Sequence, residues 1–314
     1  MLRPFTPVLH RGDSVLQVGL DQEPTLLLSG VAPGLGRVLL RLDGRHTLAE
    51  VRSCSLQHSV PLEQLDWALR QLQEAGLLSD AGGDASGRSA LAGCRIRLVG
   101  AGALGLAAAT LLVSEGLSHL TVVDQGNLEP SLYPAAGALG TQADGLAAAL
   151  AGGPTRISAP NHWSKPDGVL HDLTIVASDR LECDRVVAEG LLRTDQPHLL
   201  LRGSGGGAVV GPLIVPGETA CLRCTDLARS DADSGWPTLL PQLMRARSVV
   251  TPVLAGWAAG VAAAQVLAYL SGHRPESLGA TLEIAPPDHL TRRRSWAMHP
   301  RCGCGWGVAA EWSP

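Results

Sequence analysis

The 314-residue chain is poor in aromatic residues other than tryptophan, with one Phe and two Tyr against seven Trp. Its hydrophobic cores must therefore be built mainly from Leu, Val and Ala. The chain also lacks a dense block of Lys and Arg, and its formal net charge is -4, which excludes a general nucleic-acid-binding protein. With 45% apolar residues, it is long enough for two globular domains.

The N-terminus lacks a basic segment followed by an apolar run and a small-residue cleavage site, so we predict no signal peptide and a cytoplasmic protein. One uncharged run, from Val249 to Leu270, is long enough to cross a bilayer. It contains Thr251-Pro252 and Gln265, and it is rich in Ala and Gly rather than Leu and Ile. We interpret it as a helix buried under a sheet or at a subunit contact, rather than as a membrane span.

Four of the seven cysteines form two close pairs, Cys221-Leu-Arg-Cys224 and Cys302-Gly-Cys304. Without a secretory signal, this pattern favours thiolate metal ligands over disulfides. Four thiolates suit a tetrahedral Zn²⁺ in a closed structural site. Because residues 225–301 separate the pairs, the metal would clamp the C-terminal segment onto its domain. The alternative is a set of buried free thiols with a flexible tail. The other cysteines are interpreted as small core residues: Cys54, Cys94 and Cys183.

Residues 1–80 have the pattern of a small α+β module. The predicted elements are strands at 7–10, 15–20 and 25–29, followed by helices at 34–42, 47–53 and 61–75. Thr47-Leu-Ala-Glu50 has the form of a capping box, and leucines from Leu62 to Leu72 form one apolar stripe on the last helix. Three strands followed by three small helices predict a winged-helix-like module.

A Gly-, Ala- and Ser-rich linker, residues 81–93, leads into a second domain, residues 94–314. The predicted elements are strands at 95–99, 120–124, 173–177 and 198–202, a helix at 106–116, and an antiparallel segment from 207 to 215. The first strand, helix and second strand form a βαβ unit. We therefore expect an α/β domain with a mostly parallel, Rossmann-like sheet.

The turn after the first of these strands carries the glycine pattern Gly100-Ala-Gly102-Ala-Leu-Gly105. In a nucleotide-binding turn, Gly100 allows the tight bend, Gly102 admits a phosphate to the backbone, and Gly105 lets helix and strand pack closely. Asp124, at the end of the second strand, would bond ribose hydroxyls. The alternative is a glycine turn kept for packing in a fold that no longer binds nucleotide.

Asp179 follows the apolar strand at 173–177, where α/β folds place ligand-binding groups. It would hold the Mg²⁺ of a bound nucleotide. The alternative is a solvated loop carboxylate.

Taken together, these motifs resemble the ThiF/MoeB/HesA superfamily, the bacterial relatives of ubiquitin-activating enzymes. Within it, residues 221–237 resemble the actinobacterial ocin-ThiF or bacteriocin cyclodehydratase-type branch, which serves the making of azol(in)e-modified peptides. The resemblance covers residues 95–305 and implies a homodimer. The matching pieces are Leu98–Gly105, Leu120–Asp124, Ala177-Ser-Asp179, Pro216–Cys224, the helix around Gly256–Leu270, and His299–Cys304.

The N-terminal module resembles the PqqD-like domains that grip leader peptides of ribosomal precursors, especially over residues 42–51. Those domains hold the leader as an added strand between the third strand and the third helix. The positions implied here are Thr25, Leu26, Leu27 and Leu28 on the strand, and Leu65 and Trp67 on the helix. Trp67 lies off the leucine stripe, so the alternative for it is packing against the second domain.

The chain departs from adenylating members of the superfamily in its catalytic cations. In the register set by Asp124 and Ser131, Leu132 stands where those members carry Asn, Ala135 where they carry Arg, and Asp144 near their Lys. Gly126 replaces a second acidic residue. Removing one group that stabilises the transition state costs about 3 kcal/mol. We therefore expect weak or no adenylation, unless other cations substitute: Arg180, Arg185 or Lys165.

The resemblance implies a peptide-binding partner that presents a precursor leader to a YcaO-type cyclodehydratase, with a structural Zn²⁺ and a degenerate site for ATP and Mg²⁺. The alternative is an active adenylyltransferase that activates a carboxylate of a peptide or sulfur-carrier protein. A nicotinamide oxidoreductase would rest on the glycine turn alone, and no partner for hydride transfer is evident in the sequence.

Overall fold

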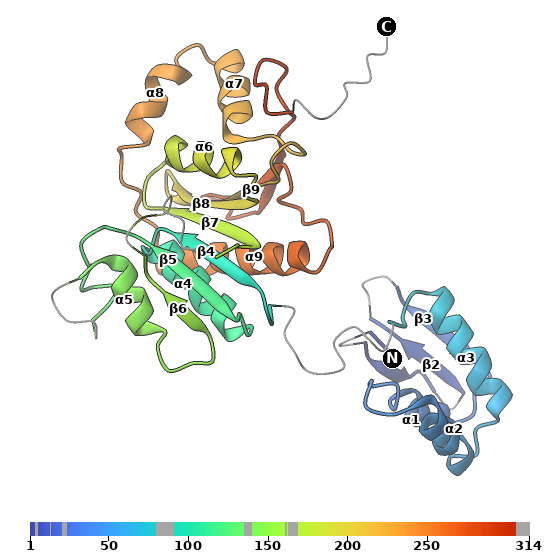
Figure 1. Ribbon diagram of the computed structural model, residues 1–314. Coiled ribbons are helices and arrows are strands. Elements are labelled where there is room, and N and C mark those ends of the chain that lie inside the picture. The colour runs from blue at the N-terminus through green and yellow to red at the C-terminus, as the bar shows by residue number, and fades with distance from the viewer. Residues whose placement is uncertain are drawn as a thin grey trace, which may run out of the picture. The chain divides into compact units, whose positions relative to one another are not determined.

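The computed structural model describes residues 1–3, 6–12, 14–20, 24–79, 91–134, 140–160, 162 and 169–305. The chain forms two compact units, Met1–Arg88 and Ser89–Pro314 (Figure 1). Each unit has its own hydrophobic core, and each is described separately.

The N-terminal unit is a three-stranded antiparallel sheet with three helices. In order, its elements are β1 (Val8–His10), β2 (Val15–Val18), β3 (Leu26–Ser29), α1 (Leu35–Leu39), α2 (Leu48–Gln57) and α3 (Leu62–Glu74). The strand order is β1-β2-β3, so β1 and β3 are both edge strands. The strands and helices lie where the sequence pattern predicted them.

Local sequence signals explain how these helices begin and which face they bury. The capping box at α2 is present: the Thr47 side chain accepts a hydrogen bond from the Glu50 N–H, and Glu50 Oε2 accepts one from the Thr47 N–H at 2.7 Å. Only part of the leucine stripe predicted on α3 faces the core, because Leu65 and Leu72 are fully buried while Leu62 is 37% exposed. The sheet contributes Leu16 and other buried side chains to the same core.

The second unit is built on an eight-stranded sheet in the order β11-β10-β9-β8-β7-β4-β5-β6. Its strands are β4 (Arg95–Val99), β5 (His119–Val123), β6 (Arg156–Ser158), β7 (Leu173–Ser178), β8 (His198–Ser204), β9 (Gly207–Ile214), β10 (Ala280–Ile284) and β11 (Arg292–Ser295). Strands β4 to β8 pair in parallel, and β9, β10 and β11 extend the sheet with antiparallel pairing. The predicted mostly parallel sheet is confirmed. Its strand order reverses at β4 and β7, and α/β folds bind ligands at the carboxyl ends of strands at such a switch point.

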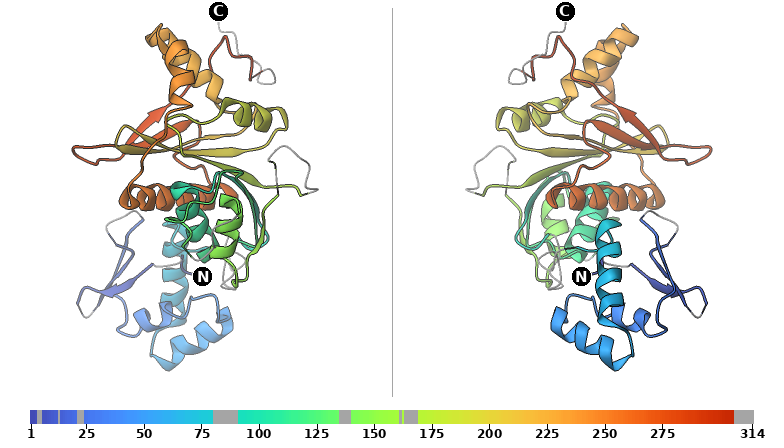
Figure 2. Two further views of the ribbon diagram at one scale, coloured as in Figure 1. Left: turned by 90° about the vertical axis from the view of Figure 1, so that its left-hand side faces the viewer. Right: turned by 90° about the vertical axis from the view of Figure 1, so that its right-hand side faces the viewer.

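Helices cover both faces of this sheet (Figure 2). The helices of this unit are α4 (Ala103–Ser114), α5 (Gln142–Ala149), α6 (Arg185–Arg193), α7 (Leu222–Ala232), α8 (Trp236–Leu243) and α9 (Pro252–Leu270). Of these, α8 lies beside α7 and buries none of its residues. Alternate residues of β7 and β8 point to opposite faces, so Ile175 and Leu199 join the core under α4 and α9, whereas Val176 and Leu200 join the core under α6.

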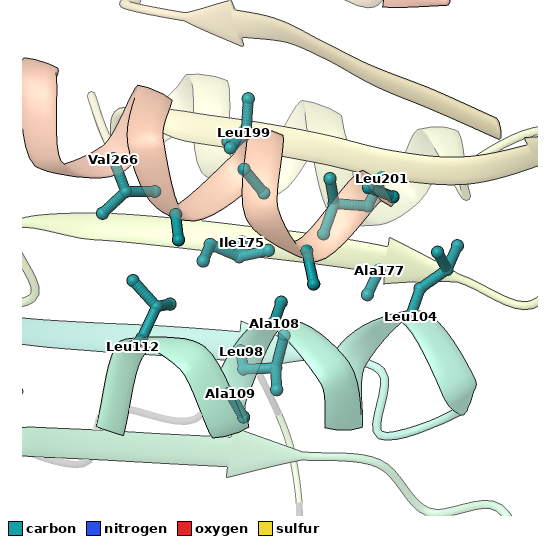
Figure 3. Close-up of a cluster of buried hydrophobic side chains, with 14 of the residues drawn as sticks. Leu98, Leu104, Ala108, Ala109, Leu112, Ile175, Ala177, Leu199, Leu201 and Val266 are labelled. Atoms are coloured by element: carbon teal, nitrogen blue, oxygen red, sulfur yellow. The ribbon is translucent and has the colours of Figure 1, made fainter. Parts of the chain in front are cut away.

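Helix α9 accounts for the long apolar run near the C-terminus. It is long and apolar enough to cross a membrane by composition. Its inner face, which carries the buried Ala258, Ala262 and Val266, packs against α4 and the sheet. Figure 3 shows Val266 on the side of α9 that faces Ala108 and Leu112 of α4. Small side chains allow this close helix packing, which agrees with a buried helix under a sheet.

Two glycine substitutions should change stability in opposite directions. A Cβ on Gly105 would lie 2.0 Å from the Gly100 carbonyl oxygen, so Gly105→Ala should lower the free energy of unfolding by about 1–3 kcal/mol. A Cβ on Gly256, inside α9, would meet no atom within 4 Å, so Gly256→Ala should raise it by about 1 kcal/mol. Urea denaturation followed by circular dichroism measures both. A loss of stability in Gly256→Ala would show that this exposed face is covered in solution.

Candidate functional site

The glycine turn joins β4 to α4 at the switch point of the sheet. Gly100 has φ +99°, and a Cβ there would lie 1.9 Å from the carbonyl oxygen of Ala177 at the end of β7. A side chain at Gly100 would therefore push β4 and β7 apart. Gly105 has the role predicted for it, because it lets the first turn of α4 pack on Gly100.

Asp124 holds this turn from the neighbouring strand. Its Oδ2 accepts a hydrogen bond from the Ala101 N–H at 2.7 Å, and its Oδ1 accepts one from the Gly126 N–H at 2.8 Å. Tyr133 adds a second tie, because its buried hydroxyl donates to the Ala101 carbonyl. The carboxylate therefore fixes the shape of the turn as well as facing the cavity beside it.

Asp179 lies directly against the turn. A Cβ on Gly102 would fall 2.0 Å from Asp179 Oδ1, so the absence of a side chain at Gly102 makes room for this carboxylate. Burial raises the pKa of Asp179 and the Asp124 carboxylate raises it further, while Arg247 acts in the opposite direction. Asp179 is exposed to solvent, and it lies beside a second acid at the edge of the cavity.

These residues border a cavity of about 420 Å³, within the range of pockets that bind small molecules. Gly100, Asp124 and Asp179 line it, whereas Gly102 and Gly105 lie behind it in the turn. The structure therefore brings the five predicted nucleotide-binding residues to one place, three as lining and two as packing. Two carboxylates side by side are the ligand type that Mg²⁺ prefers.

Two lining residues, Gln142 and Arg247, were not identified from the sequence. Gln142 is the first residue of α5, and Arg247 lies in the segment between α8 and α9. That segment runs beside the end of β7, where the Ser248 N–H donates to the Asp179 carbonyl at 2.8 Å and the Leu181 N–H donates to the Ala246 carbonyl at 3.1 Å. No sequence motif marks Arg247, because its place depends on this long-range contact.

The departures from the adenylating pattern have structural explanations. Leu132 packs against the hydrophobic core, outside the cavity. The Asp144 carboxylate closes a capping box at the start of α5, accepting from the Thr141 N–H at 2.9 Å, so it is occupied as a helix cap. Ala135 and Lys165 lie outside the described residues.

Of the two described arginines considered as substitutes, only Arg180 lines the cavity. Its Nη1 donates to the Arg245 carbonyl at 2.6 Å. Arg185 is excluded by its position, because it forms ion pairs with Glu182 and with Asp226 of α7.

Those ion pairs belong to a partly buried cluster around Glu182. Its carboxylate, 5% exposed, lies within ion-pair distance of Arg185, Arg202 and Arg229. Burial acts to raise the pKa of Glu182, but the three guanidinium charges outweigh it and hold the pKa below its usual value. Arg185 also pairs with Asp226 at 2.7 Å, so the cluster fastens α7 to the loop that follows β7.

The four paired cysteines converge at the start of α7. Their sulfurs all lie within 4.8 Å of one another, with Sγ–Sγ distances of 3.9 Å for Cys221–Cys224, 3.5 Å for Cys221–Cys302 and 3.3 Å for Cys224–Cys304. A tetrahedral ion with Zn–S bonds of about 2.3 Å requires S–S distances of about 3.8 Å. The donor set and its spacing therefore fit one Zn²⁺-like ion.

Local geometry brings these thiols together. Gly303 has φ +77°, a conformation that L side chains rarely adopt, and it turns the short Cys-Gly-Cys segment so that both thiols face α7. The His299 N–H donates to Cys224 Sγ at 3.3 Å. This bond and those from neighbouring thiols lower the pKa of Cys224 although burial opposes them, whereas burial raises the pKa of Cys304 to about 11.

The residues predicted to bind a peptide divide by exposure. Leu27 on β3 is 51% exposed, and Thr25 and Leu26 lie beside it at the sheet edge. Leu28 and Leu65 were expected to face the peptide, but both are almost fully buried in the core of the unit, so they support this surface from beneath. Their side chains point inward because β3 alternates and α3 turns its apolar stripe to the sheet.

The α3 side of this surface is fixed to the end of β3. Gln64 accepts from the Ala32 N–H at 2.8 Å and donates to the Gly30 carbonyl at 3.2 Å. Trp67 is half-buried and packs against the core of its own unit. Thr25 Oγ1 donates to the Leu20 carbonyl at 2.6 Å, which orients the entry to β3.

Removing one cysteine of the cluster should release its metal. We expect about one zinc per chain in purified protein and nearly none in Cys302→Ser, because three thiolates leave the tetrahedral set incomplete. The thermal transition of the second unit should fall, and that of the N-terminal unit should stay. Elemental analysis and calorimetry measure these, with Cys54→Ser of α2 as the control. Unchanged zinc and stability in Cys302→Ser would contradict the metal site.

Comparison with known proteins supports the architecture. No protein-family model matches the sequence, and neither does any curated protein. Solved structures do match. The crystal structure of E. coli MccB with ATP aligns with a TM-score of 0.67 and 16% identity, over 97% of this chain and 98% of that one.

Two further structures agree with it. The microcin C7 biosynthetic enzyme MccB in complex with N-formylated MccA aligns with a TM-score of 0.67 and 16% identity, over 97% of this chain and 99% of that one. PaaA aligns with a TM-score of 0.64 and 15% identity, over 93% and 98%. Likeness at these identities establishes the fold, so the chain has the fold of MccB and PaaA.

Proposed function

We propose that this protein is a peptide-binding partner in the biosynthesis of azol(in)e-modified ribosomal peptides. It binds the leader of a precursor peptide with its N-terminal unit and presents the peptide to a YcaO-type cyclodehydratase. Its second unit carries a structural zinc and a nucleotide pocket that binds ATP and Mg²⁺ with little or no adenylation. By resemblance we expect a cytoplasmic homodimer.

The observation that carries the peptide-binding role is the free edge of β3. Among the residues that the structure describes, β3 pairs only with β2, so one row of its backbone groups faces no other described strand. The exposed Leu27 lies on this edge, and α3 packs beside it. An extended peptide added here would gain backbone hydrogen bonds, and side-chain pockets would select its sequence. MccB, which has the same fold, forms complexes with the peptide MccA, which supports this role.

The charge of the nucleotide pocket supports weak adenylation. Asp124, Asp179 and Asp184 line it, against the cations Arg180 and Arg247. Activating a carboxylate with ATP builds negative charge on the reacting phosphorus, and fixed cations must meet that charge. A pocket whose acids outnumber its arginines can bind a Mg²⁺–nucleotide through the metal, but it stabilises the transition state poorly.

An active adenylyltransferase is the second candidate, and one observation favours it. Arg247 was not among the cations that the sequence offered as substitutes, and it lines the cavity. MccB was solved with ATP in this fold. If Arg247 compensates for the missing cations, the protein would form an acyl adenylate from a peptide carboxylate and release pyrophosphate.

A charge on the free edge of β3 should weaken peptide binding. We expect Leu27→Glu to bind a fluorescein-labelled precursor leader about tenfold more weakly, because the glutamate would be desolvated without a partner. The probe is a synthetic leader from a short Cys-, Ser- and Thr-rich precursor, to be sought among the neighbouring genes, and fluorescence anisotropy measures its affinity.

Leu9→Glu is the matched control, because Leu9 is 39% exposed on the opposite edge strand β1. Circular dichroism confirms that both variants are folded. Equal loss of affinity in both variants, or in neither, would show that the leader does not dock on β3.

Isotope exchange between ATP and pyrophosphate separates the two candidates. For a peptide-binding partner, we expect no exchange above the buffer rate with the precursor peptide and Mg²⁺ present. Robust exchange that depends on the peptide would establish the adenylyltransferase and refute the degenerate site.

A further inference from the structure

One lining cation of the nucleotide pocket, Arg247, is not engaged in a hydrogen bond or ion pair among the described residues. Arg180, the other arginine that lines the pocket, donates a hydrogen bond from its Nη1 to the Arg245 carbonyl. Asp184 caps α6, accepting from the Val186 N–H at 2.8 Å. Within the described part of the chain, the exposed guanidinium of Arg247 makes no hydrogen bond or ion pair, and its charge acts at longer range on Asp179, whose pKa it lowers.

The backbone of Arg247 is held firmly beside Asp179. Both its neighbours are bonded to the end of β7: Ala246 accepts from Leu181, and Ser248 donates to Asp179. Ser248 also occupies the space above Gly203 of β8, where a Cβ would lie 1.8 Å from Ser248 Oγ. Its segment can therefore approach the sheet only because residue 203 is a glycine.

Gln142 provides a second group that lacks a partner. Its side chain is 8% exposed, yet its Oε1 is buried with no hydrogen-bond donor among the described residues. It lines the same cavity, and its amide lies close to Gly126 beside Asp124. A buried carbonyl oxygen without a donor is costly, and a ligand that supplies an O–H or N–H removes that cost.

These groups have different chemical needs. Arg247 needs an anion with several oxygen acceptors, which a phosphate chain offers. Gln142 Oε1 needs a neutral donor, which a ribose hydroxyl or the amino group of a base offers. Asp124 and Asp179 would repel a bare phosphate chain, so the ligand must arrive with a divalent cation.

We infer that Arg247 is the phosphate-binding cation of this pocket and that Gln142 accepts a hydrogen bond from the nucleoside, so that together they replace the groups missing at Leu132, Ala135 and Asp144. This assignment rests on the proposed nucleotide pocket. It makes the protein a Mg²⁺–nucleotide binder whose contacts come from α5 and from the segment between α8 and α9.

The test compares ligands that differ only in their phosphates. Calorimetric titration of the full-length protein with ATP, ADP and adenosine, in Mg²⁺, should show affinity rising with the number of phosphates. Arg247→Gln should weaken ATP binding about tenfold or more and leave adenosine unchanged, since it removes a charge-assisted contact to phosphate. Arg247→Lys should recover part of the loss. Gln142→Leu should weaken ATP and adenosine by the same factor.

Arg193→Gln is the matched control, because Arg193 is 79% exposed on α6 and does not line this cavity. It should bind every ligand like the unaltered protein. Unliganded melting temperatures should be unchanged for both arginine variants.

Three results would overturn the inference. If Arg247→Gln keeps the preference for ATP over adenosine, Arg247 does not contact phosphate. If Gln142→Leu affects ATP but not adenosine, its assignment to the nucleoside is wrong. If the unaltered protein binds none of these ligands, the nucleotide pocket itself is refuted, whereas leader binding at β3 is measured separately and can still stand.

Discussion

The organisation of the second unit depends on how closely the ends of β4 and β7 approach each other at the glycine turn. A methyl group at Gly100 or Gly102 would overlap the Ala177 carbonyl or the Asp179 carboxylate. This contact places Asp179, the residue that follows β7, directly against the glycine turn, and Asp124, the residue that follows β5, is bonded to the same turn. Both acids line one cavity, and in the proposed function their proximity would favour a divalent cation there.

The loop that follows β7 and carries Asp179 also connects this pocket to the cysteine cluster. Glu182 lies three residues after Asp179 and meets three arginines, of which Arg185 also pairs with Asp226 on α7. Helix α7 begins at Cys221 and carries Cys224. Replacing such a cluster with apolar residues is often neutral for stability, but removing one partner leaves an uncompensated buried charge. We interpret this ion-pair cluster as the contact that fixes the position of α7 relative to the end of β7. It thereby also fixes the position of the cysteines that α7 carries.

Local sequence signals predicted much of this structure. Runs of Leu, Val and Ile predicted the parallel strands, the capping box predicted the start of α2, and the glycine spacing predicted a turn between β4 and α4. The two cysteine pairs predicted a cluster because metal-ligand spacing constrains residues even when they are far apart in the chain. Each of these signals acts within a few residues or through a chemistry with few alternatives.

The remaining features depend on contacts that no local pattern encodes. Arg247 reaches the cavity because its segment pairs with residues 179–181, and Gly203 gives no hint of that role in the sequence. Asp144 seemed to stand near a catalytic position, yet its carboxylate caps α5, and Gln142 two residues earlier faces the pocket. On β3 the alternation of side chains, which depends on register, decides that Leu27 is exposed and Leu28 is buried.

A pocket can keep ground-state binding while losing catalysis, because the two make different demands. Binding a Mg²⁺–nucleotide needs ligands for the metal and one cation for the phosphates, and Asp124, Asp179 and Arg247 can meet that need. Catalysis of adenylation needs groups whose interaction with the substrate becomes stronger as negative charge builds up in the transition state. With Leu132 packed in the core and Asp144 committed to a helix cap, those groups are absent from their expected places. Under the proposed function, nucleotide binding would stabilise the folded protein by mass action, and the chemistry would be left to a partner enzyme.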